Sequence, residues 1–134
     1  MPEKDEAYWK QHLTPTQYKV LRKRGTEPPF SGELVHNDLP GTYTCAGCGA
    51  ELFSSQHKFD SRSGWPSFWD VAQYGDVKLQ DDSSQGMKRV EVVCANCGGH
   101  LGHVFDDAVD QPTGKRYCIN SCALSFEKGA NKDE

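Results

Sequence analysis

Two Cys-x-x-Cys pairs, Cys45 with Cys48 and Cys94 with Cys97, constrain this chain of 134 residues more than any other feature. Two intervening residues allow both sulfurs of a pair to face one ion, and the glycine after each pair favours a tight turn. Together the pairs supply four thiolates, which form the closed tetrahedral shell of a structural zinc site. The sequence therefore predicts one structural Zn²⁺ per chain, and the ion joins segments that are far apart in the sequence.

The same thiols have two other uses, disulfide bonding and redox chemistry. Six cysteines could form three disulfides in a secreted scaffold, but the N-terminal segment MPEKDEAYWK has no secretory apolar core. One pair could instead be a redox dithiol of the thioredoxin kind, a motif that opens a helix after a buried strand. Both pairs here lie in glycine-rich turns beside predicted strands, which favours the metal site over the dithiol.

Charge and hydropathy restrict the partners that we expect. The formal net charge is −4 at neutral pH, and the only basic run, KVLRKRG, is short and typical of a solvated helix end. No apolar stretch approaches the roughly 20 residues that cross a bilayer. We therefore expect a cytoplasmic protein with neither a nucleic acid nor a membrane as partner.

Residues 1–25 are predicted to form a helical lead. Aromatic and apolar residues recur at three- and four-residue steps from Tyr8 onward, which is the period of a helix. Thr14 then provides a cap for a second helix, which Gly25 ends. The proline- and glycine-rich segment that follows is expected to be an ordered connection packed by Phe30.

The remainder of the chain alternates short β-prone segments with Gly, Asn, Asp and Pro, which is typical of a mainly antiparallel β domain. A short helix is predicted over 67–73 and a frayed tail over 127–134. The whole chain, 1–134, is predicted to be one domain. Strands are predicted over 41–45, 50–53, 76–80, 88–94, 103–107 and 115–120.

The segment KRYCIN carries a thiol outside the Cys-x-x-Cys pairs. On a strand, alternate residues face the same side, so Arg116, Cys118 and Asn120 are predicted to share one face. Tyr117 and Ile119 are then predicted to face the core. A guanidinium close to a thiol lowers the thiol pKa and favours the reactive thiolate. A buried, unreactive cysteine is the alternative, which the polar neighbours of Cys118 on its own face disfavour.

Two histidines, His100 and His103, lie in the glycine-rich segment CGGHLGHVF. A regular strand would send residues three apart to opposite faces, but the glycines permit a bulge or turn that brings both imidazoles to one side. The adjacent cysteine pair would hold that segment rigidly, as a catalytic group requires. The remaining histidines are interpreted as ordinary surface or core residues: His12, His36 and His57.

Trp65 stands between Gly64 and Pro66, a sequence typical of a tight turn. An indole is commonly a core residue, and a core position for Trp65 is the alternative interpretation. An indole held on a rigid turn can instead form one wall of a pocket.

Taken together, five segments of the sequence resemble the methionine-R-sulfoxide reductases, the B type of methionine sulfoxide reductase. They are, in chain order, GTEPPFSG, CAGC, FDSRSGWPSFW, CANCGGHLGHVFDD and PTGKRYCINS, and they extend over nearly the whole chain. The resemblance implies a fold of two small antiparallel sheets with short N-terminal helices and the four-cysteine zinc site. It also implies an enzyme that reduces the R epimer of methionine sulfoxide, free or peptide-bound, in the repair of oxidised proteins.

The resemblance also implies roles for the residues that the motifs carry. Cys118 is implied as the nucleophile that attacks the sulfoxide sulfur and becomes a sulfenic acid. A thiol reductant such as thioredoxin would then recycle it, and we expect the enzyme to be a monomer. The other implied roles are proton donation and oxygen binding by His103 and His100, an active-site amide at Asn120, support of the thiolate by Arg116, and a wall for the substrate methyl group at Trp65.

One position departs from the family pattern. Many members carry a cysteine where this sequence has Ser63, and in them that cysteine resolves the sulfenic acid as a disulfide. Cys122 is the spare thiol here, but along a continuous strand its Cα would lie about 13 Å from that of Cys118, far beyond disulfide reach. We therefore expect Cys122 to fill a small core position and an external thiol to reduce the sulfenic acid.

Two other functions are compatible with part of the sequence. A non-catalytic zinc-knuckle module would explain the four paired cysteines but would leave the Cys118 face and the two histidines without a role, and its expected basic surface is missing. A zinc deaminase requires an open metal site with a His-x-Glu segment, which the sequence lacks. The reductase interpretation accounts for both groups of residues.

Overall fold

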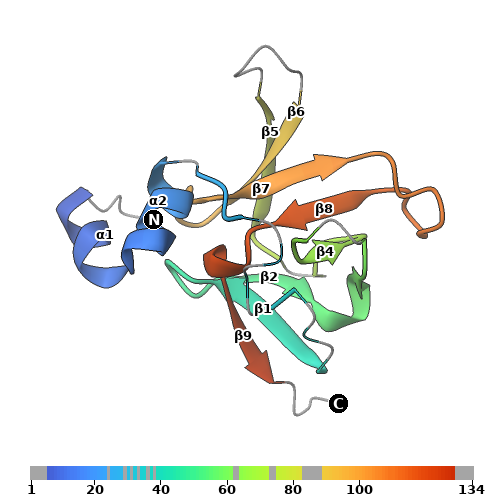
Figure 1. The fold of residues 1–134 in the computed structure, drawn as a ribbon, viewed down its shortest axis with the longest axis horizontal. Coiled ribbons are helices and arrows are strands. Elements are labelled where there is room, and N and C mark those ends of the chain that lie inside the picture. The colour runs from blue at the N-terminus through green and yellow to red at the C-terminus, as the bar shows by residue number, and fades with distance from the viewer. Residues whose placement is uncertain are drawn as a thin grey trace.

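The computed structural model describes residues 6–128 with short gaps (Figure 1). Two short helices near the N-terminus lie beside two antiparallel sheets, and turns and short connections join them. The described residues confirm the predicted mainly β fold with two antiparallel sheets. The interpretation of His36 lies outside the described residues. The gaps within 6–128 are Arg24, Pro29, Ser31, Glu33, His36 and Asp38, and the ranges 62–63, 73–74 and 83–88.

The N-terminal helices form as the sequence predicts. Helix α1 runs over Glu6–His12 and α2 over Pro15–Lys23. Between them, the Thr14 Oγ1 accepts from the Gln17 N–H at 3.1 Å and the Thr14 N–H donates to the Gln17 Oε1 at 2.9 Å, which is a capping box. Beyond α2, the Gly25 N–H donates to a carbonyl of the helix, which satisfies one of its end groups. In the described part of the chain, no helix has the length and apolar character of a membrane span.

The smaller sheet brings the C-terminal strand against an early one. Strand β1 (Gly41–Cys45) lies between β2 (Glu51–Ser54) and β9 (Leu124–Lys128), and both pairings are antiparallel. The predicted frayed tail 127–134 is therefore wrong at its start, because Glu127 and the residue after it belong to β9. Backbone pairing with β1 orders this segment although its last side chains are polar and exposed. The rest of the predicted tail lies outside the described residues.

The larger sheet has six strands: β3 (Lys58–Phe59), β4 (Ser67–Phe68), β5 (Val77–Asp82), β6 (Arg89–Cys94), β7 (His100–Phe105) and β8 (Arg116–Ile119). Their order is β3-β4-β8-β7-β6-β5, and all pairings are antiparallel. Strand β7 begins at His100 rather than at His103 as predicted. Strand β8 lies between β4, from the segment GWPSFW, and β7, which follows the second cysteine pair. Strand order therefore brings motifs that are far apart in the sequence into adjacent strands.

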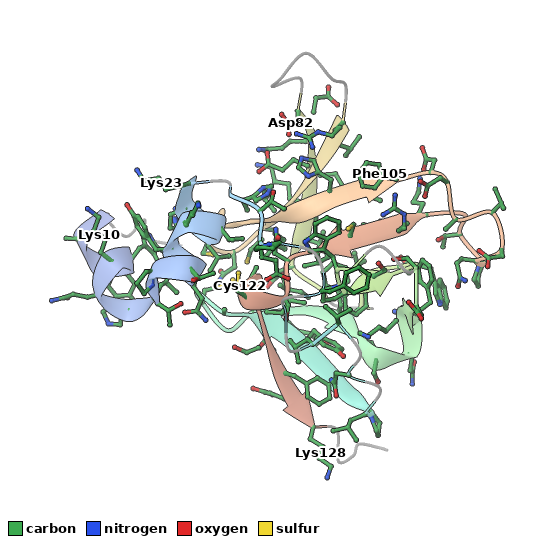
Figure 2. All side chains as sticks on the ribbon, viewed as in Figure 1. Lys10, Lys23, Asp82, Phe105, Cys122 and Lys128 are labelled. Carbon is green, nitrogen blue, oxygen red and sulfur yellow. The ribbon has the colours of Figure 1, made fainter. Side chains whose placement is uncertain are left out.

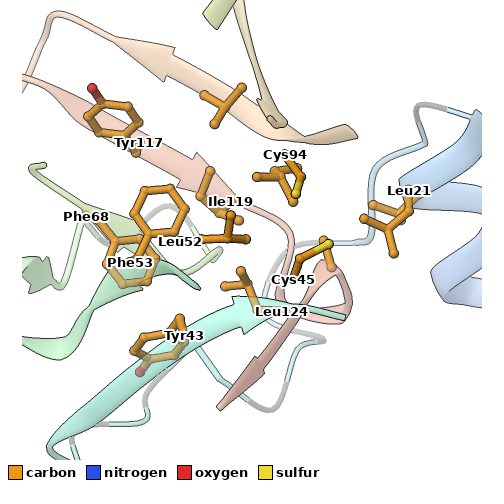
Figure 3. Packing of buried hydrophobic residues seen from close by; sticks show 14 of the residues in the cluster. Leu21, Tyr43, Cys45, Leu52, Phe53, Phe68, Cys94, Tyr117, Ile119 and Leu124 are labelled. Atoms are coloured by element: carbon orange, nitrogen blue, oxygen red, sulfur yellow. The ribbon is translucent and has the colours of Figure 1, made fainter. Parts of the chain in front are cut away.

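Aromatic and aliphatic side chains from both sheets form one core (Figure 3). Phe53 and Phe68 stack with their ring centroids 4.4 Å apart, and Tyr43 meets Phe68 edge-on at 5.1 Å. Tyr117 and Ile119 are buried in this core, as the alternation in KRYCIN predicts. Because close packing fixes these side chains of β8, it also fixes the orientation of the opposite face of that strand.

Two predictions in the connecting segments are wrong. Residues 67–72 do not form the predicted helix, because β4 pairs with β8 and the Asp70 carboxylate then accepts from the next backbone N–H, which favours a bend. Phe30 does not pack its connection: the residue is 64% exposed and has a left-handed φ of 63°. Its N–H donates to the Gly64 carbonyl, so backbone bonding rather than the aromatic ring fastens this part of the connection.

Candidate functional site

Cys45 and Cys94, at the ends of β1 and β6, lie near Leu21 of α2 (Figure 3). Cys48 and Cys97, in the turns that follow these strands, complete the group. The Sγ atoms of Cys45 and Cys97 are 3.7 Å apart. Those of Cys48 and Cys94 are 3.5 Å apart, and all four sulfurs lie within 4.8 Å of one another. Ligands about 2.3 Å from a tetrahedral zinc ion would be about 3.8 Å apart. The predicted ligands therefore form a cluster that can hold one metal ion.

Matching turns place the two pairs of sulfurs. Gly49 and Gly98 have φ values of 83° and 77°, in the left-handed region that favours glycine. Their N–H groups donate to the carbonyls of Cys45 and Cys94, each at 2.8 Å. The Nη1 of Arg22 in α2 donates to the Cys97 carbonyl at 3.0 Å. The same local turn therefore builds both halves of the cluster, and α2 is fastened to it.

The crowded thiols hold their protons unevenly. Hydrogen bonds with Cys94 and Cys97, together with burial, raise the pKa of Cys45. Hydrogen bonds with Cys45 and Cys94 lower the pKa of Cys97 to about 4. Four thiolates this close repel one another unless a cation lies between them, and a divalent metal ion removes that conflict. The cluster thus has both the spacing and the charge requirement of a metal site.

A second cysteine site lies on the larger sheet. Cys118 of β8 lines a cavity of about 130 Å³, and three other predicted site residues line the same cavity: Trp65, His103 and Asn120. They come from the turn before β4, from β7 and from the residue directly after β8, so strand order rather than sequence proximity brings them together. The other described residues that line it are Thr26, Arg89, Gly102 and Phe105.

A β-bulge in β7 sets the positions of the two histidines. The register between β6 and β7 shifts so that Leu101 is an extra residue on β7. The imidazole centroids of His100 and His103 lie 5.4 Å apart, which confirms that a bulge brings them together. His103 pairs directly with Cys118, whereas His100 is buried and is not among the described lining residues. A Cβ at Gly102 would overlap the Cys118 carbonyl oxygen, so this close pairing requires glycine.

Charged residues that sequence analysis did not identify hold both histidines. The Asp82 Oδ2 lies 2.8 Å from the His103 Nε2 and 3.5 Å from the Arg89 guanidinium. The Glu91 Oε2 lies 2.7 Å from the His100 Nδ1. Both carboxylates are buried, Asp82 at the end of β5 (Figure 2). A glutamate among the valines of RVEVVC is a signal that could have identified Glu91, because a buried charge requires a partner.

Arg116 lines a neighbouring cavity rather than that of Cys118. Its guanidinium donates two hydrogen bonds of 3.0 Å to the Asp107 carboxylate and lies 4.5 Å from the Phe105 ring centroid. Asp107 is the main cause that raises the pKa of Arg116, and Cys118 adds to the rise.

Cys122 lies in the turn that follows β8 (Figure 2). Strand β8 is followed by a 3₁₀ turn, η3 (Ser121–Ala123), so the continuous strand assumed between Cys118 and Cys122 is wrong. Cys122 is half-buried and lines a separate cavity of about 750 Å³. Burial raises the pKa of Cys122 to about 12, and the Glu27 carboxylate adds to the rise. Ser63, at the other position where a second thiol was considered, lies outside the described residues.

Comparisons with known proteins agree with these features. A family model described as the SelR domain matches residues 13–128. A peptide methionine sulfoxide reductase MsrB of Methanosarcina mazei is 60% identical over 126 residues, which cover 94% of this chain and 89% of the relative. The MsrB of Leptospira interrogans is 56% identical over 125 residues, or 93% of this chain and 95% of the relative. The mitochondrial methionine-R-sulfoxide reductase B3 of Mus musculus is 55% identical over 117 residues, or 87% of this chain and 46% of the relative. This chain therefore belongs to the SelR-domain family, the B-type methionine sulfoxide reductases, and is an oxidoreductase of that family.

Proposed function

We propose that this enzyme reduces the R epimer of methionine sulfoxide, free or within a peptide, by passing the sulfoxide oxygen to Cys118. The observation that carries the proposal is that Cys118, His103, Trp65 and Asn120 line one cavity. They supply a thiol, an acid–base group, an aromatic wall and an amide. The cavity volume of about 130 Å³ suits the end of one side chain rather than a bulky cofactor.

The proposed reaction is an oxygen transfer between two sulfur atoms. The Cys118 thiolate attacks the sulfoxide sulfur. The S–O bond of the substrate breaks, an S–O bond to Cys118 forms, and one proton is taken up, so the products are methionine and a Cys118 sulfenic acid. The substrate sulfur is reduced by two electrons and the cysteine sulfur is oxidised by two. The Arg116 charge supports this step by favouring the thiolate.

His103 is the proposed proton donor. It lies opposite Cys118 in the β7–β8 pairing, and Asp82 holds its Nε2 at 2.8 Å. A proton donor at the sulfoxide oxygen neutralises the charge that develops as the S–O bond breaks. His100, which Glu91 holds beside His103, is proposed to support oxygen binding.

The R preference would follow from two fixed partners of the sulfoxide. The Trp65 ring is the proposed wall for the ε-methyl group, while His103 and Asn120 are the proposed partners of the oxygen. In the S epimer these two groups exchange places. The methyl group would then face hydrogen-bond donors and the oxygen would face an apolar ring, which costs the oxygen its hydrogen bonds.

A thiol reductant completes the proposed cycle. One external thiol condenses with the sulfenic acid to give a mixed disulfide and water, and a second thiol releases Cys118. The separate cavity and raised pKa of Cys122 support reduction by an external dithiol such as thioredoxin. The proposal is that the enzyme does this as a monomer in the cytoplasm, where it repairs oxidised proteins.

The four-cysteine cluster is proposed to hold one structural Zn²⁺. Sulfur separations of 3.5 and 3.7 Å support a tetrahedral ion. Four protein ligands leave no open position, so the ion would supply a crosslink between β1 and β6 rather than chemistry. Because β7 begins shortly after the second cysteine pair, the crosslink would also restrain the strand that carries the histidines.

Turnover of a mixture of R and S sulfoxides tests the proposed function. With dithiothreitol as reductant, we expect the enzyme to consume the R epimer and to leave the S epimer. Chiral separation of the remaining sulfoxide measures both. Equal consumption of the two epimers would contradict the stereochemical proposal, and consumption of neither would contradict the proposed function.

A further inference from the structure

Glu27 is a buried carboxylate that the proposed chemistry does not use. Its Oε2 accepts from the Ser121 N–H at 2.8 Å, and its Oε1 accepts from the Cys122 N–H at 3.0 Å. These two N–H groups open η3, the turn that follows β8. Hydrogen bonds to a buried charged group are short and strong. Glu27 therefore fastens the connection before β1 to the segment directly after the strand of Cys118.

The backbone of Glu27 holds two residues of the Cys118 cavity. Its N–H donates to the Asn120 Oδ1 at 3.0 Å, and its carbonyl accepts from the Trp65 Nε1 at 2.9 Å. Its neighbour Thr26 lines the same cavity. One residue thus contacts both the amide and the indole that the proposed function assigns to substrate binding.

Asn120 occupies the position from which an asparagine ordinarily caps a helical turn. Asn120 makes no side-chain bond of that kind, and the Glu27 carboxylate occupies the N–H groups instead. The Asn120 amide is thereby released to bridge the Glu27 N–H and the Leu101 carbonyl, at 3.0 Å each. A backbone donor at its oxygen and a backbone acceptor at its nitrogen fix the direction of the amide.

We infer that Glu27 is a positioning residue of this reductase: by capping η3 in place of Asn120, it holds the Asn120 amide and the Trp65 indole in the orientation that substrate binding requires. The inference rests on the proposed function. Glu27 acts through its neighbours, because its carboxylate bonds to the turn and it is not among the described residues that line the Cys118 cavity.

Kinetics of Glu27→Gln provide the first test. Glutamine keeps the size of the side chain, but its amide NH₂ would oppose one of the two N–H groups of η3. We expect kcat/KM for the R-sulfoxide to fall about 10- to 100-fold, which is the size of effect that small displacements of binding groups produce. Glu127→Gln, an exposed substitution on β9, should leave it unchanged.

A double-mutant cycle separates positioning from general destabilisation. If Glu27 acts through Asn120, Glu27→Gln should lower kcat/KM by a much smaller factor in an Asn120→Ala background than in wild type. An equal fall in kcat/KM in both backgrounds would overturn the inference. If Glu27→Gln does not fold, Glu27→Asp can replace it in the same cycle. Aspartate retains the carboxylate, but its side chain is one methylene shorter and places the carboxylate farther from η3.

Nitrogen-15 NMR gives a second measurement that does not depend on activity. Glu27→Gln should shift the Trp65 indole N–H and the Asn120 side-chain amide signals, whereas the Trp9 indole signal should stay in place. Unchanged Trp65 and Asn120 signals would overturn the inference even in an active enzyme. If the wild-type protein reduces neither epimer, the proposed function fails, and these signals still decide whether Glu27 holds Asn120 and Trp65.

Discussion

The four-cysteine cluster and the Cys118 cavity place the same side chain in opposite surroundings. In the cluster, four sulfurs lie within 4.8 Å of one another, so each sulfur has the other three as close neighbours. In the cavity, Cys118 is the one thiol among an imidazole, an indole and an amide, with the Arg116 charge nearby. The first arrangement can hold a metal ion, whereas the second places a single thiol at a cavity of about 130 Å³.

The two regions also differ in how the sequence specifies them. A local turn that ends in Gly49 or Gly98 shapes each cysteine pair. The cavity instead joins Trp65, His103 and Cys118, and their approach depends on the strand order β4-β8-β7. A spacing motif is enough to indicate a pair of candidate metal ligands, whereas the surroundings of Cys118 are created by tertiary structure.

The largest effect is expected at Cys118, where a substitution should abolish turnover without affecting metal binding. Cys118→Ser should lower R-sulfoxide turnover by roughly 10⁴-fold or more, because an alcohol is a far weaker nucleophile than a thiolate near neutral pH. Its zinc content and melting temperature should match those of wild type. Steady-state turnover, metal analysis and thermal unfolding measure the three quantities. Turnover close to that of wild type would show that Cys118 is not the nucleophile, and the contrast between the two regions would then fail.

The converse substitution, Cys45→Ser, should act on stability. Loss of one thiolate should remove the zinc and lower the free energy of unfolding by about 4 kcal/mol or more, because metal binding and folding are coupled. Metal analysis and chemical denaturation measure these changes. Cys122→Ser is the matched control, since it also removes one thiol but should retain zinc. A full zinc complement with an unchanged melting temperature in Cys45→Ser would exclude the metal site.

Local patterns predicted the parts of both regions that depend on neighbouring residues. The spacing of the paired cysteines indicated the cluster, and Thr14 indicated the start of α2. Alternation around Cys118 indicated which side chains of β8 face the core. The glycines near His100 and His103 indicated the bulge. In each case the physical cause lies within a few residues of the motif.

Other features depend on partners that are distant in the sequence and could not be predicted in this way. Strand β9 is ordered by β1, although its own sequence is typical of a polar tail. Asp82 reaches His103 across the sheet, and its sequence context carries no periodic signal. The bend after β8 involves Glu27, which is 94 residues from Ser121. These groups fix the site without being part of its motifs.

An intermediate effect is expected at His103, where a substitution tests whether a second residue of the cavity takes part in the reaction. His103→Ala should slow the first sulfenic-acid-forming turnover by about 10²-fold or more, as loss of a general acid does. Single-turnover kinetics with the R-sulfoxide measure this step apart from recycling. His12→Ala, an exposed histidine on α1, is the matched control and should leave the rate unchanged. A near-normal single-turnover rate in His103→Ala would remove His103 from the mechanism.

The smallest effect is expected at Cys122, the thiol that belongs to neither region. A thiol whose pKa burial raises to about 12 is almost entirely protonated near neutral pH, so it is a poor nucleophile toward a sulfenic acid. Cys122→Ser should therefore keep most of the turnover that dithiothreitol or thioredoxin supports. Steady-state rates with each reductant measure this, and a selective loss with one of them would show that Cys122 takes part in recycling.

Mass spectrometry of the wild-type protein examines the same point without a mutation. After one equivalent of R-sulfoxide, we expect a sulfenic acid at Cys118 that dimedone traps, and little Cys118–Cys122 disulfide. The Cys122 N–H is bonded to Glu27, so Cys122 could move toward Cys118 only if η3 gave up hydrogen bonds to a buried carboxylate, which is costly. A dominant Cys118–Cys122 disulfide, together with lost recycling in Cys122→Ser, would show instead that η3 opens during the cycle and that Cys122 is the resolving thiol.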